Sequence, residues 1–267
     1  MLFHGVTRCW QDFEAVLPGL VEKFQVFAPD HRGHGGSSWG GSEYRIADFS
    51  RDAVAFLDAF VPRSAILLGH SLGAMVAAMV AVQRPSRVRG LILEDPPGTL
   101  LAERFPESRF RLQFTHTLRL LRAPHDVDSL TNELAVMQVQ RPSDGAVVHF
   151  SELRDARAIR FGAECLMKVD PQVLSTLTEG RWLEELDWFE ALLGVECPTL
   201  LLRADPAAGG MLDADEATRI ASLIPDCTRV DLPGIGHAIH STQPEKMLSL
   251  VQDFVVRTGL LSSTKTA

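Results

Sequence analysis

The chain has 267 residues, of which 46% are hydrophobic and 22% are charged, and these proportions are ordinary for a globular protein of enzyme size. Its length suits a single α/β domain that carries an insertion better than two equal domains. The formal net charge of −8 argues against a nucleic-acid partner, because phosphate binding requires a basic face.

Two further patterns concern the surroundings of the protein. The least polar stretch, residues 64–83, contains His70, Ser71 and two glycines, so it predicts a buried strand and helix rather than a membrane span. The four cysteines are far apart in the sequence and include no CxxC pair. With no signal peptide ahead of them, they predict free thiols in the reducing cytoplasm.

Short apolar runs alternate with longer amphipathic stretches along the chain. The short runs predict strands at residues 24–28, 65–68, 91–93, 198–202 and 229–232. The amphipathic stretches predict helices at residues 10–23, 48–60, 72–84, 213–223 and 244–256. Strands and helices in alternation indicate an α/β fold, with a mostly parallel sheet covered by helices on both faces.

Residues 99–193 interrupt this alternation, since they contain helical pieces and no strand-like run. We therefore expect a helical cap at 99–193, inserted into an α/β core made of 1–98 and 194–260, and a flexible tail at 261–267. The cap contains eight phenylalanine and tryptophan side chains, which we expect to form its own hydrophobic core rather than a ligand pocket. Its arginines could attract an acidic substrate, but a solvated helix face is their more ordinary role. These arginines are Arg104, Arg109, Arg111, Arg119 and Arg122.

The pentapeptide GHSLG places Ser71 between a predicted strand and the helix that begins at Leu72. A strand that turns directly into a helix forces the residue at the corner into a strained backbone conformation, and the neighbouring chain comes close. Gly69 and Gly73 have no side chains that would clash there. The corner also directs the amide of Leu72 toward any negative charge that develops beside Ser71. This context favours Ser71 as a nucleophile over a hydroxyl that merely starts a helix.

A serine hydroxyl becomes an effective nucleophile only when a base removes its proton. Among the nine histidines, His237 is the best placed, because the segment LPGIGHAIH puts it in a glycine-containing loop after the last predicted strand. Such a loop can return to the edge of the sheet where Ser71 emerges. His240 is the alternative base, although hydrogen bonding within the loop is its more ordinary role.

The base in turn requires a carboxylate that fixes its tautomer and stabilises the imidazolium. Asp205 ends a buried strand in the segment PTLLLRADP and is the first choice. Asp95 and Glu94 end the preceding strand in the segment LILEDPP and remain alternatives, as does Asp213.

These motifs together resemble those of the α/β-hydrolase family. The matching segments are LFHG, APDHRGHGGSS, GHSLG, LILEDPP, PTLLLRAD and GIGHAIH, and the resemblance extends over residues 2 to about 255. The resemblance implies the order Ser, Asp, His along the chain and an oxyanion hole made by the backbone amides of Val6 and Leu72. It also implies that His31 and His34 belong to a structural loop rather than to a metal site, and it requires neither a cofactor nor a metal.

Two departures from the family pattern affect these expectations. The family commonly has a glycine after the fifth matched strand and an acid a few residues later, whereas here Ala204 stands at that position and Asp205 follows at once. Family members also carry an antiparallel hairpin before the His-Gly motif, and we expect this hairpin to be absent, since only three residues precede His4. Without it, residues 24–28 would form a hydrophobic edge strand, so we expect a form extended at the N-terminus to be more soluble.

The serine at the elbow also narrows the reaction. Relatives that open epoxides or remove halide carry an aspartate there, and epoxide opening relies on cap tyrosines, whereas the one tyrosine here is Tyr44. Serine with a histidine base implies acyl transfer, so we expect a hydrolase acting on a small-molecule ester, lactone or thioester through an acyl-serine intermediate. The alternatives are carbon–carbon bond hydrolysis or cofactor-free perhydrolysis by the same triad, and a ligand-binding protein that keeps the fold without turnover.

Overall fold

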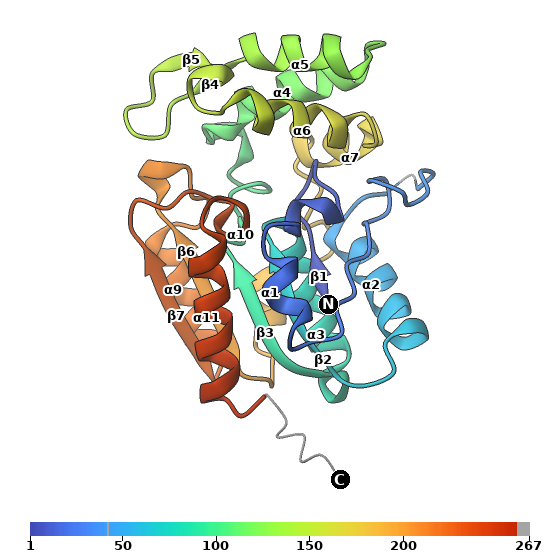
Figure 1. The fold of residues 1–267 in the computed structure, drawn as a ribbon, viewed down its shortest axis with the longest axis vertical. Coiled ribbons are helices and arrows are strands. Elements are labelled where there is room, and N and C mark those ends of the chain that lie inside the picture. Colours follow the sequence, from blue (N-terminus) through green and yellow to red (C-terminus); the bar gives the residue numbers. More distant parts are fainter. Residues whose placement is uncertain (42, 261–267) are drawn as a thin grey trace.

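A computed structural model describes residues 1–41 and 43–260, so the predicted tail at 261–267 lies outside the described residues. At its centre is a five-stranded sheet with the order β1-β2-β3-β6-β7 (Figure 1). All neighbouring pairs in it are parallel, as the alternation of strands and helices predicted. The strands are β1 (Leu2–Phe3), β2 (Ala65–His70), β3 (Val88–Glu94), β6 (Thr199–Ala204) and β7 (Cys227–Leu232).

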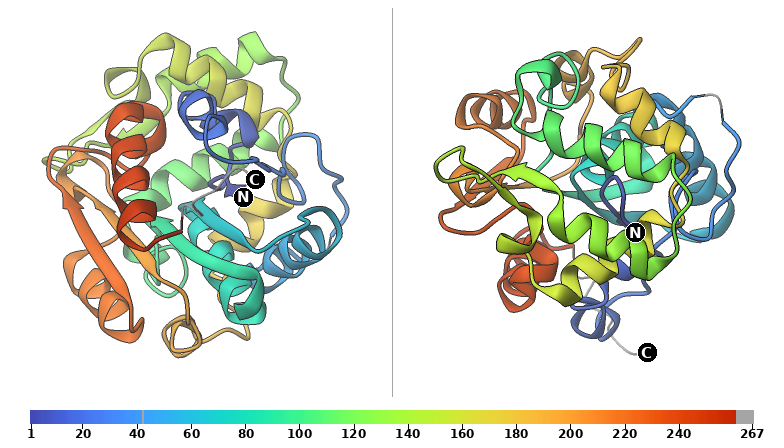
Figure 2. Two further views of the ribbon diagram at one scale, coloured as in Figure 1. Left: turned by 60° about the horizontal axis from the view of Figure 1, so that its bottom comes forward. Right: turned by 90° about the horizontal axis from the view of Figure 1, so that it is seen from above.

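Helices cover both faces of the sheet (Figures 1 and 2). One face carries α1 (Leu17–Val21) and α11 (Pro244–Arg257), whose apolar side chains form a buried cluster with the strands. The other face carries α2 (Ile46–Phe60), α3 (Leu72–Gln83) and α9 (Ala214–Leu223), which contribute to a larger cluster. The core also contains the short segments η1 (Trp10–Phe13), η2 (Pro85–Arg87), η5 (Pro206–Ala208) and α10 (Ile239–Thr242). No helix among the described residues is long and apolar enough to cross a membrane.

Residues 24–28 do not form the strand that their apolar pattern predicted. They run beside β1, and a backbone hydrogen bond joins Leu2 N to Phe27 O at 2.8 Å. Their side chains still alternate between the two faces, because Phe24 and Val26 pack against one cluster and Phe27 packs against the other. A strand needs a ladder of hydrogen bonds, and β1, with two residues, is too short to supply one.

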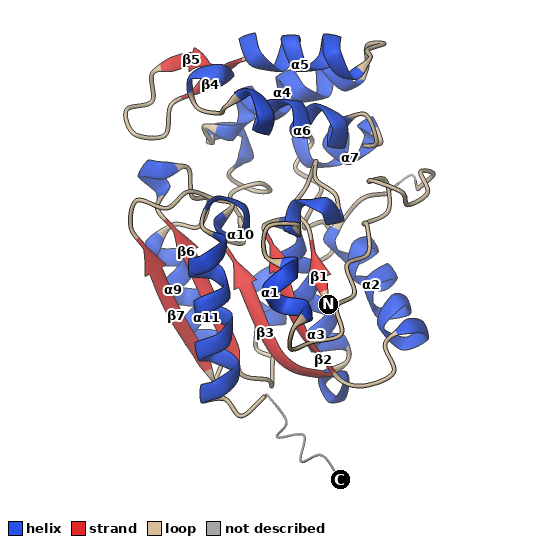
Figure 3. Ribbon diagram, viewed as in Figure 1, coloured by secondary structure: helices blue, strands red, loops and turns tan. Residues whose placement is uncertain are grey.

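Most of residues 99–193, referred to below as the insertion, lie over the carboxyl ends of the strands (Figures 1 and 2). The prediction that this segment contains no strand is wrong, because β4 (Gln138–Gln140) and β5 (Val147–His149) form an antiparallel hairpin (Figure 3). Each strand has three residues, of which only the central valine is buried, so the alternation is too short to recognise in the sequence. The helical segments are η3 (Phe105–Glu107), α4 (Phe110–Leu121), α5 (Val127–Val136), η4 (Phe150–Glu152), α6 (Ala156–Leu166), α7 (Pro171–Thr178) and α8 (Trp188–Leu192).

The insertion has a small hydrophobic core of its own, but most of its aromatic side chains lie elsewhere. Its own cluster consists of aliphatic side chains from α5, α6 and the hairpin. The large cluster shared with the sheet contains Phe105, Phe114, Trp182, Trp188 and Phe189. This differs from the predicted aromatic cap core, because the chain returns to the sheet through α7 and α8, which pack against the main core.

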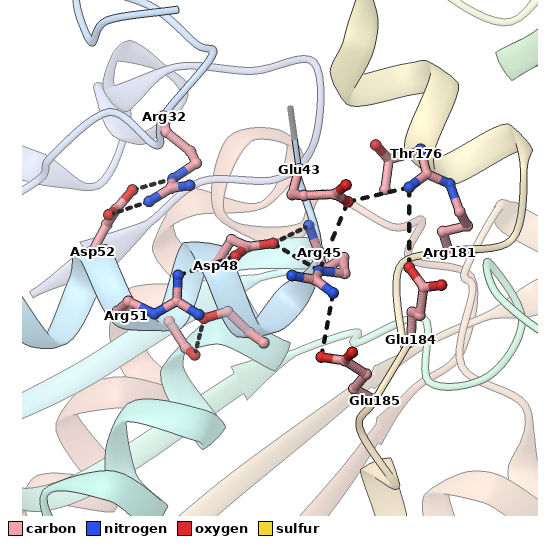
Figure 4. A network of polar contacts seen from close by, with 12 residues as sticks. Arg32, Glu43, Arg45, Asp48, Arg51, Asp52, Thr176, Arg181, Glu184 and Glu185 are labelled. Atoms are coloured by element: carbon pink, nitrogen blue, oxygen red, sulfur yellow. Dashed lines mark hydrogen bonds and ion pairs between the residues drawn. The ribbon is translucent and has the colours of Figure 1, made fainter. Parts of the chain in front are cut away.

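Ion pairs join the start of α2 to residues 181–185, the returning segment near the end of the insertion (Figure 4). Arg45 pairs with Glu185 at 3.3 Å, and Arg181 pairs with Glu43 at 3.1 Å. A backbone hydrogen bond from Ile46 N to a carbonyl of the returning segment (3.0 Å) runs parallel to them. Exposed ion pairs of this kind contribute little to stability, so their main effect is to fix how the two segments lie together.

Candidate active site

Ser71 lies at the sharp turn between β2 and α3, and its backbone has φ 55° and ψ −119°. A positive φ is unfavourable for a serine, so the surrounding structure has to impose it. Its amide donates to the Glu94 carbonyl at the end of β3 (2.9 Å). A Cβ on Gly69 would lie 2.1 Å from the Gly73 carbonyl oxygen, and a Cβ on Gly73 would lie 2.0 Å from that of Phe3. The predicted strained corner, with glycines where the chain comes close, is therefore confirmed.

The loop that follows β1 lies against this turn, since a Cβ on Gly5 would lie 3.4 Å from Ser71 Cβ. Arg8 N donates to Gly5 O (3.2 Å) and closes a tight turn, in which Val6 is followed by a residue with φ 66°. Closing the turn uses the amide of Arg8 and not that of Val6. The amide of Leu72, the first residue of α3, has no partner within the helix. Both amides are thus available as candidates for an oxyanion hole.

Three buried histidines hold this loop in place. His31 N donates to His4 Nε2 (3.1 Å), and Thr7 N donates to His34 Nε2 (3.4 Å). Burial lowers the pKa of His31 to about 3 and that of His34 to about 4, and it lowers the pKa of His4 well below its ordinary value. The three rings are therefore neutral, and His31 and His34 act through hydrogen bonds within the loops, as the resemblance implied.

His237 lies in the loop between β7 and α10, and its Nδ1 is 2.6 Å from Asp95 Oδ2. Asp95 follows β3 directly, is fully buried and has a φ of 43°. Its carboxylate also accepts hydrogen bonds from Ala204 N (3.1 Å), Met211 N (2.7 Å) and Leu212 N (3.3 Å). These donors fix the orientation of the carboxylate toward His237.

The prediction that Asp205 is the partner of His237 is wrong in this structure. The Asp205 carboxylate accepts hydrogen bonds from Ala207 N in its own loop (2.9 Å) and from Gly234 N in the loop that carries His237 (2.8 Å), and these bonds lower its pKa. The chain turns away immediately after β6, so this carboxylate faces the turn, whereas the following residues pass the end of β3 and bring their amides to Asp95. The missing glycine after β6 was the signal in the sequence that the usual acid position had changed.

Among the remaining alternatives, Asp213 caps α9 and pairs with Arg104 at 2.8 Å, while Glu94 and His240 pair with each other rather than with His237. Glu94 accepts a hydrogen bond from His240 N (2.9 Å), and its Oε2 lies 2.8 Å from His240 Nδ1. His240 Nε2 lies 3.2 Å from Asp12 Oδ2, and Asp12 pairs with Arg8 at 2.5 Å. Burial opposes protonation of His240, but the two carboxylates outweigh it and raise its pKa to about 10. Arg8 and His240 thus balance Asp12 and Glu94 in a buried network.

His70, which the sequence did not single out although it precedes the serine in GHSLG, lies between this network and His237. Its ring centroid is 4.4 Å from that of His237 and 4.8 Å from that of His240. Burial, followed by the charges of these two rings, lowers its pKa well below the ordinary value. Asp12, His70 and His240 could each offer a ligand atom to a metal, since these atoms lie within 4.8 Å of one another. The positive charge of Arg8 already compensates Asp12, so ion pairing accounts for the group.

The nucleophile, base and acid candidates follow β2, β7 and β3, so the parallel sheet brings them to one edge. The hydrogen bonds of the described residues do not include one between Ser71 Oγ and His237. In unliganded enzymes such a bond is often long and shortens when the substrate binds. The order along the chain is serine, acid, histidine, as the resemblance implied.

Comparison with known proteins establishes the family. A family model of the alpha/beta hydrolase fold matches residues 1–244. The chain belongs to the alpha/beta hydrolase family. The sequence-based prediction of this fold, with a mostly parallel sheet between helices, is thereby confirmed.

Relatives within the family are hydrolases of several kinds. The chain is 25% identical over 261 residues to 2-(acetamidomethylene)succinate hydrolase of Mesorhizobium japonicum. This alignment covers 96% of this chain and 87% of the relative. It is 26% identical to haloalkane dehalogenase 2 of Mycobacterium tuberculosis, over 94% of this chain and 85% of the relative. The solved structure of an esterase from a marine microorganism superposes with a TM-score of 0.74 at 18% identity, over 95% of this chain and 93% of the other.

A cavity of about 470 Å³ in this alpha/beta hydrolase lies between the insertion and the loop after β6. Its walls include three arginines of the insertion, Arg109, Arg141 and Arg154. Arg109 donates to two backbone carbonyls of that loop (2.7 and 2.6 Å). Burial lowers the pKa of Arg109, and the charge of Asp95 opposes this shift without cancelling it. Arg154 is exposed to solvent, with the positive charge of Arg8 nearby. The cavity also contains Glu152, which pairs with Arg141 at 3.5 Å, and its lining does not include Ser71, Asp95 or His237.

Proposed function

We propose that this protein is a serine hydrolase that cleaves a carboxylic ester, lactone or thioester through an acyl-serine intermediate. Ser71 is the nucleophile, His237 the base and Asp95 the acid. The contact of 2.6 Å between His237 Nδ1 and Asp95 Oδ2, at the same edge of the sheet as the strained serine, carries this proposal. A serine at the elbow favours acyl transfer over the halide chemistry named for the dehalogenase relative.

The proposed mechanism assigns one step to each group. Asp95 accepts a hydrogen bond from the protonated Nδ1 of His237, which leaves Nε2 free to take the proton of Ser71 as the hydroxyl attacks the carbonyl carbon. The amides of Val6 and Leu72 stabilise the oxyanion that forms. The imidazolium then protonates the leaving group, and a water molecule activated by His237 hydrolyses the acyl-enzyme. In this proposal the insertion acts as a cap that shields the reaction from solvent.

We further propose that the substrate carries a carboxylate. Arg154 lines the cavity between the insertion and the loop after β6, and its planar guanidinium suits paired hydrogen bonds to a carboxylate. Arg109 lines the same cavity, whereas Arg141 is already paired with Asp144 at 3.0 Å and with Glu152 at 3.5 Å. The name of the Mesorhizobium relative, a hydrolase of a succinate derivative, agrees with an acidic substrate.

Covalent labelling tests the proposed nucleophile. An alkyl fluorophosphonate transfers its phosphonyl group to an activated serine and displaces fluoride, so we expect it to label the wild-type protein and not the Ser71→Ala variant. The matched control is Ser222→Ala, which removes an exposed hydroxyl at the end of α9 and should label like the wild type. Circular dichroism confirms that each variant is folded. A folded wild-type protein that is not labelled would favour a ligand-binding protein over a hydrolase.

A further inference from the structure

Two cysteines from distant parts of the chain meet where the insertion touches the core. Cys9 lies in the loop after β1, three residues beyond Val6, and Cys165 lies in α6 of the insertion. Their sulfur atoms are 3.3 Å apart, although 156 positions separate the two residues in the sequence. Both side chains are buried, with 4% and 1% of their surface exposed. The two thiols are therefore in direct contact inside the protein.

The surroundings make the two thiols unequal. The hydrogen bond with Cys165 lowers the pKa of Cys9, burial opposes this shift, and the nearby charge of Arg8 assists it. The same contact raises the pKa of Cys165. The guanidinium of Arg8 also lies 4.7 Å from the ring centre of Phe161 in α6, so this positive charge lies where the insertion contacts the loop after β1. Cys9 is taken as the attacking thiolate, and attack by Cys165 would give the same disulfide, because either sulfur can be the donor in their contact.

The geometry requires only a small change to form a bond. A disulfide places its sulfur atoms about 2.0 Å apart, so the two side chains have to approach by roughly 1 Å. The hydrogen bonds of the described residues include no such sulfur–sulfur contact for the other two cysteines. Cys197 precedes β6, Cys227 is the first residue of β7, and burial raises the pKa of each to about 11. They are suitable internal controls.

We propose that Cys9 and Cys165 are a peroxide-sensitive pair whose disulfide ties the insertion to the loop that carries Val6. In the first step the Cys9 thiolate attacks one oxygen of hydrogen peroxide and breaks the O–O bond, which gives a sulfenic acid and, after protonation, one water molecule. In the second step the sulfur of Cys165 attacks the sulfur of the sulfenic acid, the S–S bond forms, and the hydroxyl leaves as a second water molecule. Two thiols are oxidised, and one peroxide is reduced to two waters.

The bond would change how the insertion moves. α6 is one of the two helices that form the separate core of the insertion, so a link at Cys165 holds that core to the sheet domain. A covalent link across 156 positions also restricts the unfolded chain. If substrate reaches Ser71 by displacement of the insertion, a consequence that rests on the proposed function, the oxidised protein admits substrate more slowly.

Peptide mapping without reduction tests the proposal on the full chain. After treatment with hydrogen peroxide and alkylation of the remaining thiols, we expect one cross-linked peptide that joins Cys9 to Cys165 and disappears on addition of dithiothreitol. The link should be absent from Cys9→Ser and Cys165→Ser and present in the controls Cys197→Ser and Cys227→Ser. Two unlinked thiols in the peroxide-treated wild type, or oxidation of Cys9 to a sulfinic acid instead, would overturn the proposal, and this readout needs no variant to fold.

Two further measurements separate the tether from the chemistry of the site. The oxidised wild type should melt roughly 5 °C higher than the reduced form, and an unchanged Tm would show that the link does not restrain the insertion. Labelling of Ser71 by a fluorophosphonate should be slower after oxidation, and equal rates would contradict the effect on access. A protein that labels in neither state counts against the proposed hydrolase and leaves the mass-spectrometric result unaffected.

Discussion

Both carboxylate oxygens of Asp95 accept hydrogen bonds, and replacing Asp95 by asparagine removes one of these two acceptors. Oδ1 accepts hydrogen bonds from Ala204 N and Leu212 N, and Oδ2 accepts from Met211 N and lies 2.6 Å from His237 Nδ1. An asparagine amide has one oxygen and one NH₂ group, so in either orientation the NH₂ faces backbone donors. A buried donor left without an acceptor costs about 1–3 kcal/mol, so we expect the Asp95→Asn variant to lose that much stability and still fold.

The expected effect on catalysis is larger than the effect on stability. If the asparagine turns its NH₂ toward His237, the ring keeps its proton on Nε2 and cannot accept one from Ser71. We therefore expect kcat to fall on the order of 10⁴-fold, which corresponds to about 5 kcal/mol in the activation barrier. KM should change little, because Asp95 is fully buried behind the histidine.

The matched control is Asp205→Asn, which makes the same chemical change in a carboxylate that caps a loop. Its oxygens accept from Ala207 N and from Gly234 N, which lies in the loop that carries His237, but the Nδ1 contact of His237 is with Asp95, so we expect kcat to stay within about threefold of the wild type. Both variants are measured with p-nitrophenyl esters of graded chain length, and Tm confirms folding. The reasoning would be refuted if Asp95→Asn kept activity within tenfold of the wild type while Asp205→Asn lost more than a hundredfold.

Two further predictions concern charge. Arg154→Gln should lower kcat/KM for the acidic ester p-nitrophenyl hemiglutarate by about tenfold and leave kcat/KM for the neutral ester p-nitrophenyl acetate unchanged. The control Arg157→Gln, on the exposed side of α6, should change kcat/KM for neither ester. Equal losses on both esters in Arg154→Gln would contradict an acidic substrate. Urea unfolding should show a maximum of stability at about pH 6.5. At higher pH the stability falls, because only the folded chain keeps the proton of His240 up to its raised pKa of about 10. At lower pH the stability falls by up to about 1.4 kcal/mol per histidine per pH unit, because only the unfolded chain protonates the buried rings. A stability that is constant from pH 5 to 10 would contradict these assignments, which for the acidic side rest on His4, His31, His34 and His70.

Local patterns in the sequence determined the features that depend on neighbouring residues. The alternation of apolar and amphipathic segments predicted the strands and helices, because each element reflects its own periodicity. The turn at Ser71 was predictable for the same reason, since Gly69 and Gly73 lie within two positions of the serine. Having no Cβ, they allow the Gly73 and Phe3 carbonyls to approach closely. The histidine loop after the last strand was also visible, because His237 follows β7 by a few residues.

The tertiary structure decided the features that depend on which segments meet. Asp95 and His237 are 142 positions apart, and both Asp95 and Asp205 directly follow a strand of the parallel sheet. The path of the chain after β6 decides between them, because it turns the carboxylate of Asp205 into its own loop and delivers two amides to Asp95. The contact between Cys9 and Cys165 arises in the same way. Sequence encodes the conformational preference of each segment, but hydrogen-bond partners across the sheet edge are fixed only when the segments pack.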